Sequence, residues 1–95
     1  MLTYKAAYQF VDDGWVFAQV LDFPGAVTQG KGLDDARTML QSALVDLAET
    51  YVDIGKPFPK PNPDASDPQA DIEEPIYLLL QGASAVNIVP VGVSK

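Results

Sequence analysis

The sequence contains no cysteine and no histidine. Without cysteine there is no disulfide, no thiol nucleophile and no thiolate metal ligand, and without histidine the usual imidazole base and the commonest metal ligand are missing. Serine and threonine are present, but no histidine is available to activate them as nucleophiles. We therefore expect a protein that is not an enzyme and that needs no metal and no cofactor.

Basic residues are scarce as well. Six lysines and arginines stand against thirteen aspartates and glutamates, which gives a formal net charge of -7. This charge repels the phosphates of nucleic acids and suits a basic protein partner. We therefore expect no direct binding of DNA or RNA.

Long apolar runs are also missing. The longest run falls far short of the roughly 20 residues that cross a bilayer, and no charged-then-apolar leader opens the sequence. We expect a cytoplasmic protein without membrane association. The chain of 95 residues makes one small domain, and because small domains bury a lower fraction of their surface, we expect a homo-oligomer.

The first residues alternate in the manner of a half-buried β-strand. Between Leu2 and Val11, one face carries Tyr4, Ala6, Tyr8 and Phe10, and the other carries Thr3, Lys5, Ala7 and Gln9. Asp12-Asp13-Gly14 then signals a hairpin, closed either by a two-residue loop or by a three-residue loop that ends in a left-handed Gly14. We prefer the three-residue loop, because its register places the apolar residues of both strands on one face.

This register matters for two large aromatic residues. It places Val16, Ala18 and Val20 inside and leaves Trp15 and Phe17 on the outer face, beside the acidic turn. Aromatic residues ringed by polar groups are enriched in protein interfaces. The alternatives are that the C-terminal strand or a second copy of the chain covers the pair.

A turn and a helix follow. Pro24-Gly25 is the pair that a type II turn requires, and a short third strand is expected over Gly25 to Gln29. Gly30 to Gly32 lets the chain leave the sheet, and an apolar pattern of helical period runs from Leu33 to Ile54. A helix N-terminus can hold a phosphate, but acidic residues occupy this one, so we expect capping. The residues with expected turn or cap roles are Gly14, Pro24, Gly25, Gly30, Gly32, Asp35 and Gly55.

The chain changes character after Gly55. Alternating prolines predict an extended segment over residues 56–63, and the polar, acidic run from Pro63 to Asp71 predicts a surface loop, ordered or disordered. The apolar run from Ile76 to Leu80, preceded by Pro75, predicts a strand that returns to the sheet. Ala85 to Val93 predicts a further strand, at an edge or at a subunit contact.

Together these elements predict an α+β fold. Its order is β-β-β-α-β, a two-layer sandwich in which one long helix covers an antiparallel three-stranded meander, with the returning strand and an extra C-terminal strand. We divide the chain into a core over residues 1–61, an acidic proline-rich linker over 62–74, and two C-terminal strands over 75–95 that complete the same domain.

The ordered set of motifs resembles the HicB-like antitoxin family. The motifs are Asp13-Gly14, Pro24-Gly25, Thr28-Gln29-Gly30, Asp34-Asp35-Ala36 and Gly55-Lys56-Pro57-Phe58-Pro59. Gly32 stands where the family usually has a serine or threonine cap, and Ala26 stands where it often has cysteine. The resemblance implies a partial ribonuclease H-like fold.

The resemblance also implies a function. HicB-like antitoxins bind a small, basic, RNA-cleaving toxin of the HicA type and neutralise it by occlusion. Residues 62–95 show no basic helix, so the family's C-terminal DNA-binding segment is not evident. The alternative is an orphan member that serves as a homo-oligomeric structural or regulatory protein without a toxin partner.

The carboxylates do not follow the pattern of a two-metal nuclease, which needs several that converge, usually with one on the first strand. No acidic residue precedes Asp12, and we expect neither catalytic nor metal-binding residues. The expected partner-binding residues are Asp12, Asp13, Trp15, Phe17, Asp22 and Phe23. The residues expected at an oligomer interface are Leu78, Val86, Ile88 and Val89.

Overall fold

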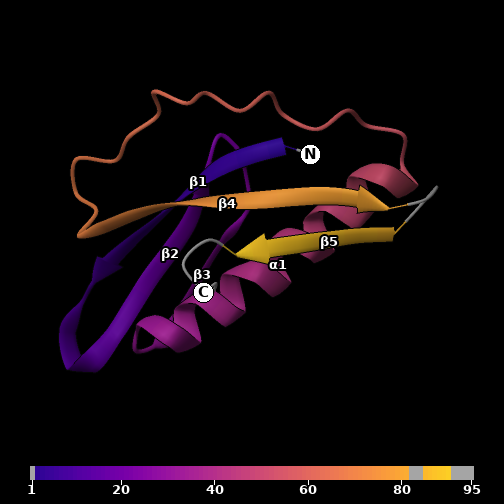
Figure 1. The fold of residues 1–95 in the computed structure, drawn as a ribbon. Helices are drawn as coiled ribbons and strands as arrows, with labels where there is room; N and C mark the ends of the chain where they lie inside the picture. The colour runs from indigo at the N-terminus through magenta and orange to yellow at the C-terminus, as the bar shows by residue number, and fades with distance from the viewer. Residues whose placement is uncertain (1, 82–84, 91–95) are drawn as a thin grey trace.

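The chain forms one antiparallel sheet with a long helix against it. The computed structural model describes residues 2–81 and 85–90. Its elements are β1 (Leu2–Phe10), the 3-10 turn η1 (Asp12–Gly14), β2 (Trp15–Leu21), β3 (Val27–Lys31), α1 (Leu33–Asp53), β4 (Ile72–Gln81) and β5 (Ala85–Pro90). The five strands lie in the order β3-β2-β1-β4-β5, and α1 crosses one face of the sheet (Figure 1). The α+β architecture predicted from the sequence is confirmed.

The β1–β2 hairpin has the register of the three-residue loop. Ala6 lies opposite Val20 and Tyr8 opposite Ala18, so the apolar side chains of both strands share the face that packs against the helix. The turn contains two left-handed residues, with φ 64 at Asp13 and φ 81 in the glycine that follows. Aspartate and glycine adopt this conformation more readily than most residues.

The chain turns from β2 into β3 at Pro24-Gly25. The amide of Ala26 donates to the carbonyl of Phe23 at 3.1 Å, and Gly25 has φ 90, as a type II turn requires of its third residue. β3 then continues past Gln29 to Lys31. Gly30, where the sequence suggested that the chain leaves the sheet, is therefore still part of β3.

Gly30 allows the helix to approach β3 closely. A Cβ atom on Gly30 would lie 2.4 Å from the backbone nitrogen of Ala36 in α1. A larger residue would therefore push the first turn of the helix away from the sheet. α1 begins directly after its N-cap, Gly32.

The two ends of α1 are held in different ways, by a side chain of the first turn at the start and by backbone hydrogen bonds at the end. At the start, the Asp35 carboxylate accepts a hydrogen bond from the amide of Lys31 at 2.8 Å. At the end, Gly55 has φ 71, and the amide of Lys56 donates to the carbonyl of Tyr51 at 2.8 Å. This 6→1 bond across a left-handed glycine is characteristic of a Schellman motif.

The core lies between α1 and the inner face of the sheet. At one end, the ring of Phe23 lies 5.2 Å from that of Tyr4 and 5.1 Å from that of Tyr51, measured between centroids. The buried residues of the helix are Ala36, Leu40, Leu44, Ala48 and Tyr51. Phe10, which the alternation assigns to the inner face, lies at the end of β1 and is 52% exposed.

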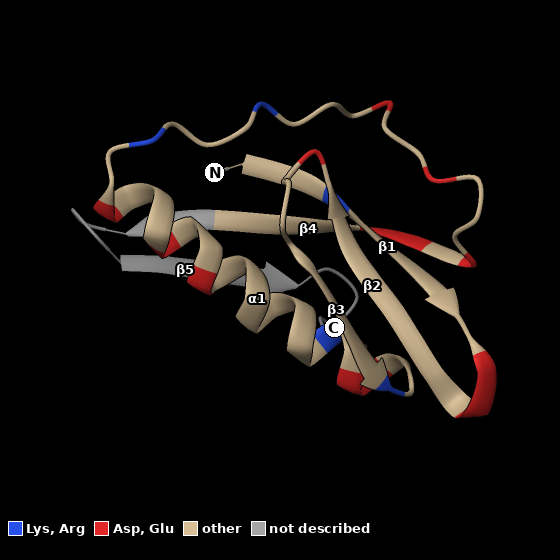
Figure 2. Cartoon of the chain, turned by 180° about the vertical axis from the view of Figure 1, so that it is seen from behind, with Lys and Arg blue, Asp and Glu red and all other residues tan. Residues whose placement is uncertain are grey.

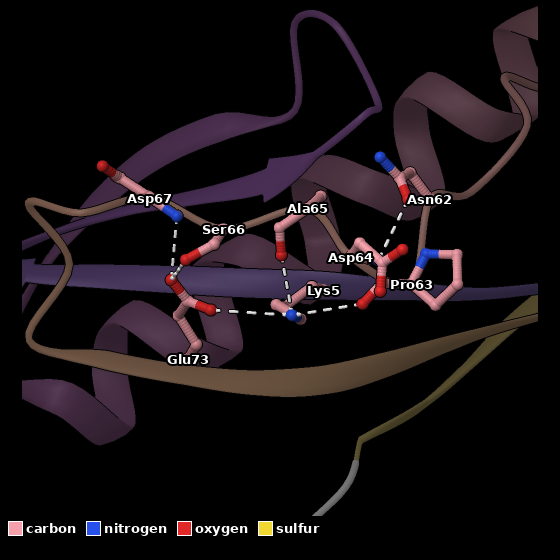
Figure 3. A network of polar contacts seen from close by, with 8 residues as sticks. All are labelled: Lys5, Asn62, Pro63, Asp64, Ala65, Ser66, Asp67 and Glu73. Atoms are coloured by element: carbon pink, nitrogen blue, oxygen red, sulfur yellow. Dashed lines mark hydrogen bonds and ion pairs between the residues drawn. The ribbon is translucent and has the colours of Figure 1, made fainter.

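The segment between α1 and β4 returns along the outer face of the sheet. We call residues 62–71 the strap, and Figure 1 shows its path toward the start of β4. Nζ of Lys5 donates to the carbonyl of Ala65 at 2.7 Å and pairs with Glu73 at 3.7 Å (Figure 3). The acidic surface loop expected here is therefore attached to the sheet by side chains.

The strap seals the outer face at Ala7. In the sheet, Ala7 lies between Gln19 of β2 and Glu73 of β4. Asp67 reaches both neighbours, since its carboxylate accepts from Gln19 at 3.1 Å and its amide donates to Glu73 at 2.8 Å. Ala7 is consequently 2% exposed although it faces away from α1.

β4 begins earlier than the sequence suggests. It starts at Ile72, and Pro75 lies within it, opposite Lys5 of β1. Among the described residues, β5 ends at Pro90, opposite Ile76, and Pro75 is paired with β1. Proline has no N–H to donate to a ladder, so it is more common at the start or the edge of a strand than inside one.

Candidate partner-binding face

The part of the outer face formed by β2 and β3 is open to solvent. Phe17 lies between Gln9 and Gln29 in the sheet, and Trp15 lies opposite Lys31. The exposed fractions are 40% for Trp15, 36% for Phe17 and 50% for Val27. We define the aromatic face as Gln9, Trp15, Phe17, Val27, Gln29 and Lys31.

The C-terminal strand does not cover the aromatic face. β5 pairs with β4 at the edge of the sheet opposite to β3, and β1 and β4 separate it from β2. Of the coverings considered for Trp15 and Phe17, this one is excluded for residues 85–90. A second copy of the chain, the other covering considered, stays open as a possibility for this surface.

Lys31 and the β1–β2 turn meet at Trp15. Nζ of Lys31 lies 5.0 Å from the centroid of the Trp15 ring and donates to the carbonyl oxygen of Asp13 at 2.8 Å. Asp12 and Asp13 are exposed, and neither takes part in an ion pair within the described part of the chain. The turn that precedes the exposed Trp15 therefore carries two exposed carboxylates that pair with no cation of the described residues.

Asp22 and Phe23 have structural roles. The Asp22 carboxylate accepts a hydrogen bond from the amide of Asn62 at 2.9 Å, which fixes the beginning of the strap. Phe23 is 1% exposed, because the turn at Pro24-Gly25 directs its ring into the aromatic end of the core. This placement corrects the expectation that Phe23 contacts a partner.

The expected oligomer-interface residues divide into two groups. Leu78 is 2% exposed and belongs to the core cluster of a single chain, so its side chain offers no surface to a second subunit. This corrects the expectation for Leu78. The backbone of Val86, Ile88 and Val89 forms part of β5, and their side chains lie outside the described part of the structure.

The described carboxylates do not converge. No group of three or more aspartates or glutamates in residues 2–81 and 85–90 is placed to hold a metal ion. Figure 2 shows the acidic residues spread over the hairpin tip, the helix and the strap. Among the described residues, no helix is both long and apolar enough to cross a membrane.

Several cations are already engaged within the chain. The guanidinium of Arg37 binds both carboxylate oxygens of Glu74 at 2.9 and 3.0 Å, and Lys5 holds the strap. Nζ of Lys56 lies 4.7 Å from the ring centroid of Tyr51. Because acidic residues outnumber basic ones by thirteen to six, these contacts leave a predominantly negative surface, which attracts a basic partner.

The shifted pKa values belong to the core, to the Arg37–Glu74 pair and to the contact between β4 and the strap. Burial raises the pKa of Tyr4 to about 12, and the nearby Tyr51 and Asp22 add to the effect. The pKa of the Glu73 carboxyl is lowered, chiefly by the hydrogen bond from the amide of Asp67 and also by Ser66 and Lys5. Both shifts reflect how the chain is packed, and neither group lies on the aromatic face.

Sequence reasoning missed Val27, Gln29 and Lys31 of the aromatic face. The sequence pattern could have predicted their orientation, because the alternation of β3 places Thr28 and Gly30 inward. Val27, Gln29 and Lys31 then point outward. Their neighbours become clear only once β2 and β3 are paired across the turn, which sets Lys31 opposite Trp15. The anchors of the strap carried no comparable signal, since they depend on the path of an irregular segment.

The sequence matches no protein-family model and no curated protein. The fold is similar to the crystal structure of the N-terminal domain of the Burkholderia pseudomallei antitoxin HicB, with a TM-score of 0.69 and 21% sequence identity. The similarity covers 83% of this chain and 100% of that domain. The resemblance to HicB-like proteins is thereby confirmed at the level of the fold.

Proposed function

We propose that this chain is an antitoxin-type module that binds a small, basic, RNA-cleaving toxin of the HicA type in the cytoplasm and neutralises it by occlusion. One observation carries the proposal: Trp15 and Phe17 are exposed on the strand that follows the turn with the exposed Asp12 and Asp13, on a fold similar to that of an antitoxin domain. The chain contributes contact and charge, and it performs no chemistry itself.

The composition of the aromatic face suits this role. Protein interfaces concentrate their binding energy in a few aromatic and arginine residues that a polar rim shields from water. Trp15, Phe17 and Val27 supply the apolar centre, and Gln9 and Gln29 lie beside Phe17. The surrounding negative charge accelerates encounter with a basic protein and competes for the surface with which that protein would hold RNA.

The proposal is tested by a search of the neighbouring reading frames for a small basic protein and by co-expression of the chain with it; the absence of such a frame would count against the proposal. We expect the two chains to co-purify, and we expect RNA cleavage by the partner to stop at equimolar chain. Replacement of both Trp15 and Phe17 by alanine should weaken inhibition at least about tenfold, the effect of losing two central aromatic contacts. Met39→Ala is the matched control, because Met39 lies on α1 and is 44% exposed.

Two results would contradict this function. One is RNA cleavage that continues at full rate in the presence of excess chain. The other is equal inhibition by the native chain and by the double alanine variant, which would place the contact elsewhere.

The alternative is a homo-oligomeric structural or regulatory protein without a toxin partner. The same exposed side chains favour it, since a second copy of the chain could also cover them. The net charge of -7 opposes it, because two copies repel each other. Light scattering separates the two functions: a dimer that persists at all concentrations, and that the double alanine variant loses, favours the homo-oligomer.

A further inference from the structure

The geometry points to an arginine-binding site on the aromatic face, formed by the ring of Trp15, the carbonyl oxygen of Asp13 and the carboxylates of the β1–β2 turn. In the isolated chain, Lys31 occupies this site. The inference rests on the proposed function and deepens it, because it names the residue type by which a basic partner is recognised.

The contacts of Lys31 show what the site accepts. Its Nζ lies 5.0 Å from the centroid of the Trp15 ring, within the range of a cation–π interaction. The same atom donates to the carbonyl oxygen of Asp13 at 2.8 Å. A cation at this place therefore meets an aromatic face and a hydrogen-bond acceptor at once.

The site has more acceptors than a lysine uses. Lys31 makes its hydrogen bond to a backbone oxygen of the turn, and no ion pair within the described residues involves the carboxylate of Asp12 or that of Asp13. A guanidinium carries five donors in a planar fork, stacks on aromatic rings and is more weakly hydrated than an ammonium. An arginine can thus lie on the indole and bond to the turn in several places, where Lys31 bonds to one.

The side chain of Lys31 can move away from the Trp15 ring without disturbing the fold. Its backbone is fixed by pairing with Trp15 across β2 and β3 and by the hydrogen bond from its amide to Asp35. The side chain itself is exposed. An incoming arginine therefore replaces one solvated cation by another, and the strand stays in place.

Trp15 reports directly on occupancy, because it is the only tryptophan in the chain. The experiment is a fluorescence titration of the full chain at low salt with capped peptides of equal length in which alternate positions are arginine, lysine or glutamine. We expect saturable binding of the arginine peptide, binding of the lysine peptide that is roughly 2- to 5-fold weaker, and no binding of the glutamine peptide.

Two sets of variants sharpen the test. Lys31→Ala removes the internal competitor and should tighten arginine-peptide binding by roughly 2- to 5-fold. The double variant Asp12→Asn and Asp13→Asn should weaken it by a similar factor. Asp46→Asn, which removes one negative charge from α1, is the control for general attraction and should leave the titration nearly unchanged.

Three outcomes would overturn the site. They are the absence of saturable binding, equal affinity for the arginine and lysine peptides, and weaker or unchanged binding by Lys31→Ala. The toxin experiment is independent of these readouts. If the peptides bind as expected but no toxin is inhibited, the arginine site is supported and the proposed function is refuted. If a toxin is inhibited but the peptides do not bind as expected, only the arginine site is refuted.

Discussion

The outer face of the sheet has two halves, one covered by the chain itself and one exposed to solvent. Both arise from the same alternation of side chains along the strands. Over β1 and β4 the chain covers its own sheet: the strap lies across it, and Ala7 is 2% exposed. Over β2 and β3 nothing within the described residues covers Trp15, which is 40% exposed. Polar side chains that bond to the strap close the covered half, and the open half keeps large apolar side chains that no other segment of the described residues covers.

The two halves differ in the chemistry of their side chains. Lys5, Gln19 and Glu73 are long polar residues that find acceptors and donors in the strap. The open half offers an indole, a phenyl ring and a valine, which gain most from burial against another surface. Four changes test the comparison, from the largest expected effect to the smallest.

The largest effect should come from Gly30→Ala, which breaks the support beneath the open half. The new Cβ would lie 2.4 Å from the nitrogen of Ala36, so the helix start must move. We expect a loss of about 3 kcal/mol in the free energy of unfolding, the upper end of overpacking effects. Urea denaturation measures it, with Gln29→Ala in the same strand as control; equal stability of the two variants would refute the close contact.

Lys5→Ala should open the covered half. It removes the hydrogen bond to Ala65 and the ion pair with Glu73, at a cost of about 1 to 2 kcal/mol. Hydrogen exchange at Ala65 and Asp67 should accelerate while exchange in the centre of α1 stays slow. Lys60→Ala, which removes an exposed lysine between α1 and the strap, serves as control, and uniform acceleration throughout the chain would contradict a local role.

Acid should loosen the strap in the same place. The folded-state pKa of Glu73 is lowered, first by the amide of Asp67, so its stabilising contribution is present above the unfolded pKa of about 4.3 and is lost as the pH falls through the folded value. The Asp67 amide should therefore lose exchange protection on the acid side. Glu73→Gln should remove this pH dependence, and an NMR titration of Glu73 that gives an ordinary or raised pKa would argue against the contact.

The smallest effect on stability should come from Phe17→Ala in the open half. Surface substitutions away from packed features usually change the free energy of unfolding by less than about 0.5 kcal/mol. The variant should thus unfold like the native chain while it loses affinity for a basic partner. A large loss of stability would mean that Phe17 is packed in the isolated chain and that the two halves are alike.

Much of the scaffold could be predicted from local patterns. The alternation in β1 and β2 was sufficient to choose the hairpin register, because only one register separates apolar from polar residues. The pair Pro24-Gly25 specified its turn, and the helical period of the apolar residues specified α1. In each case a short-range rule and the packing of the fold agree.

The remaining features depend on contacts between distant segments. Phe23 lies between an acidic residue and a turn, and nothing local indicates that its ring packs on Tyr4 and Tyr51. The strap is polar and contains prolines, so its composition predicts an open loop. In the structure, however, the single residue Asp67 contacts both β2 and β4. Pro75 hid the true start of β4, since proline more often begins a strand than occupies its interior.

The hydrogen bond that Asp35 accepts from the amide of Lys31 also affects how β3 meets other chains. β3 is an edge strand, and such strands invite pairing that grows into aggregates. The amide of Lys31 is already bonded to Asp35, and that of Val27 donates to the carbonyl of Gly25, so two of its amides are unavailable to an intruding strand. β3 therefore has an exposed apolar surface beside it, while only part of its own edge is open to pairing with another strand.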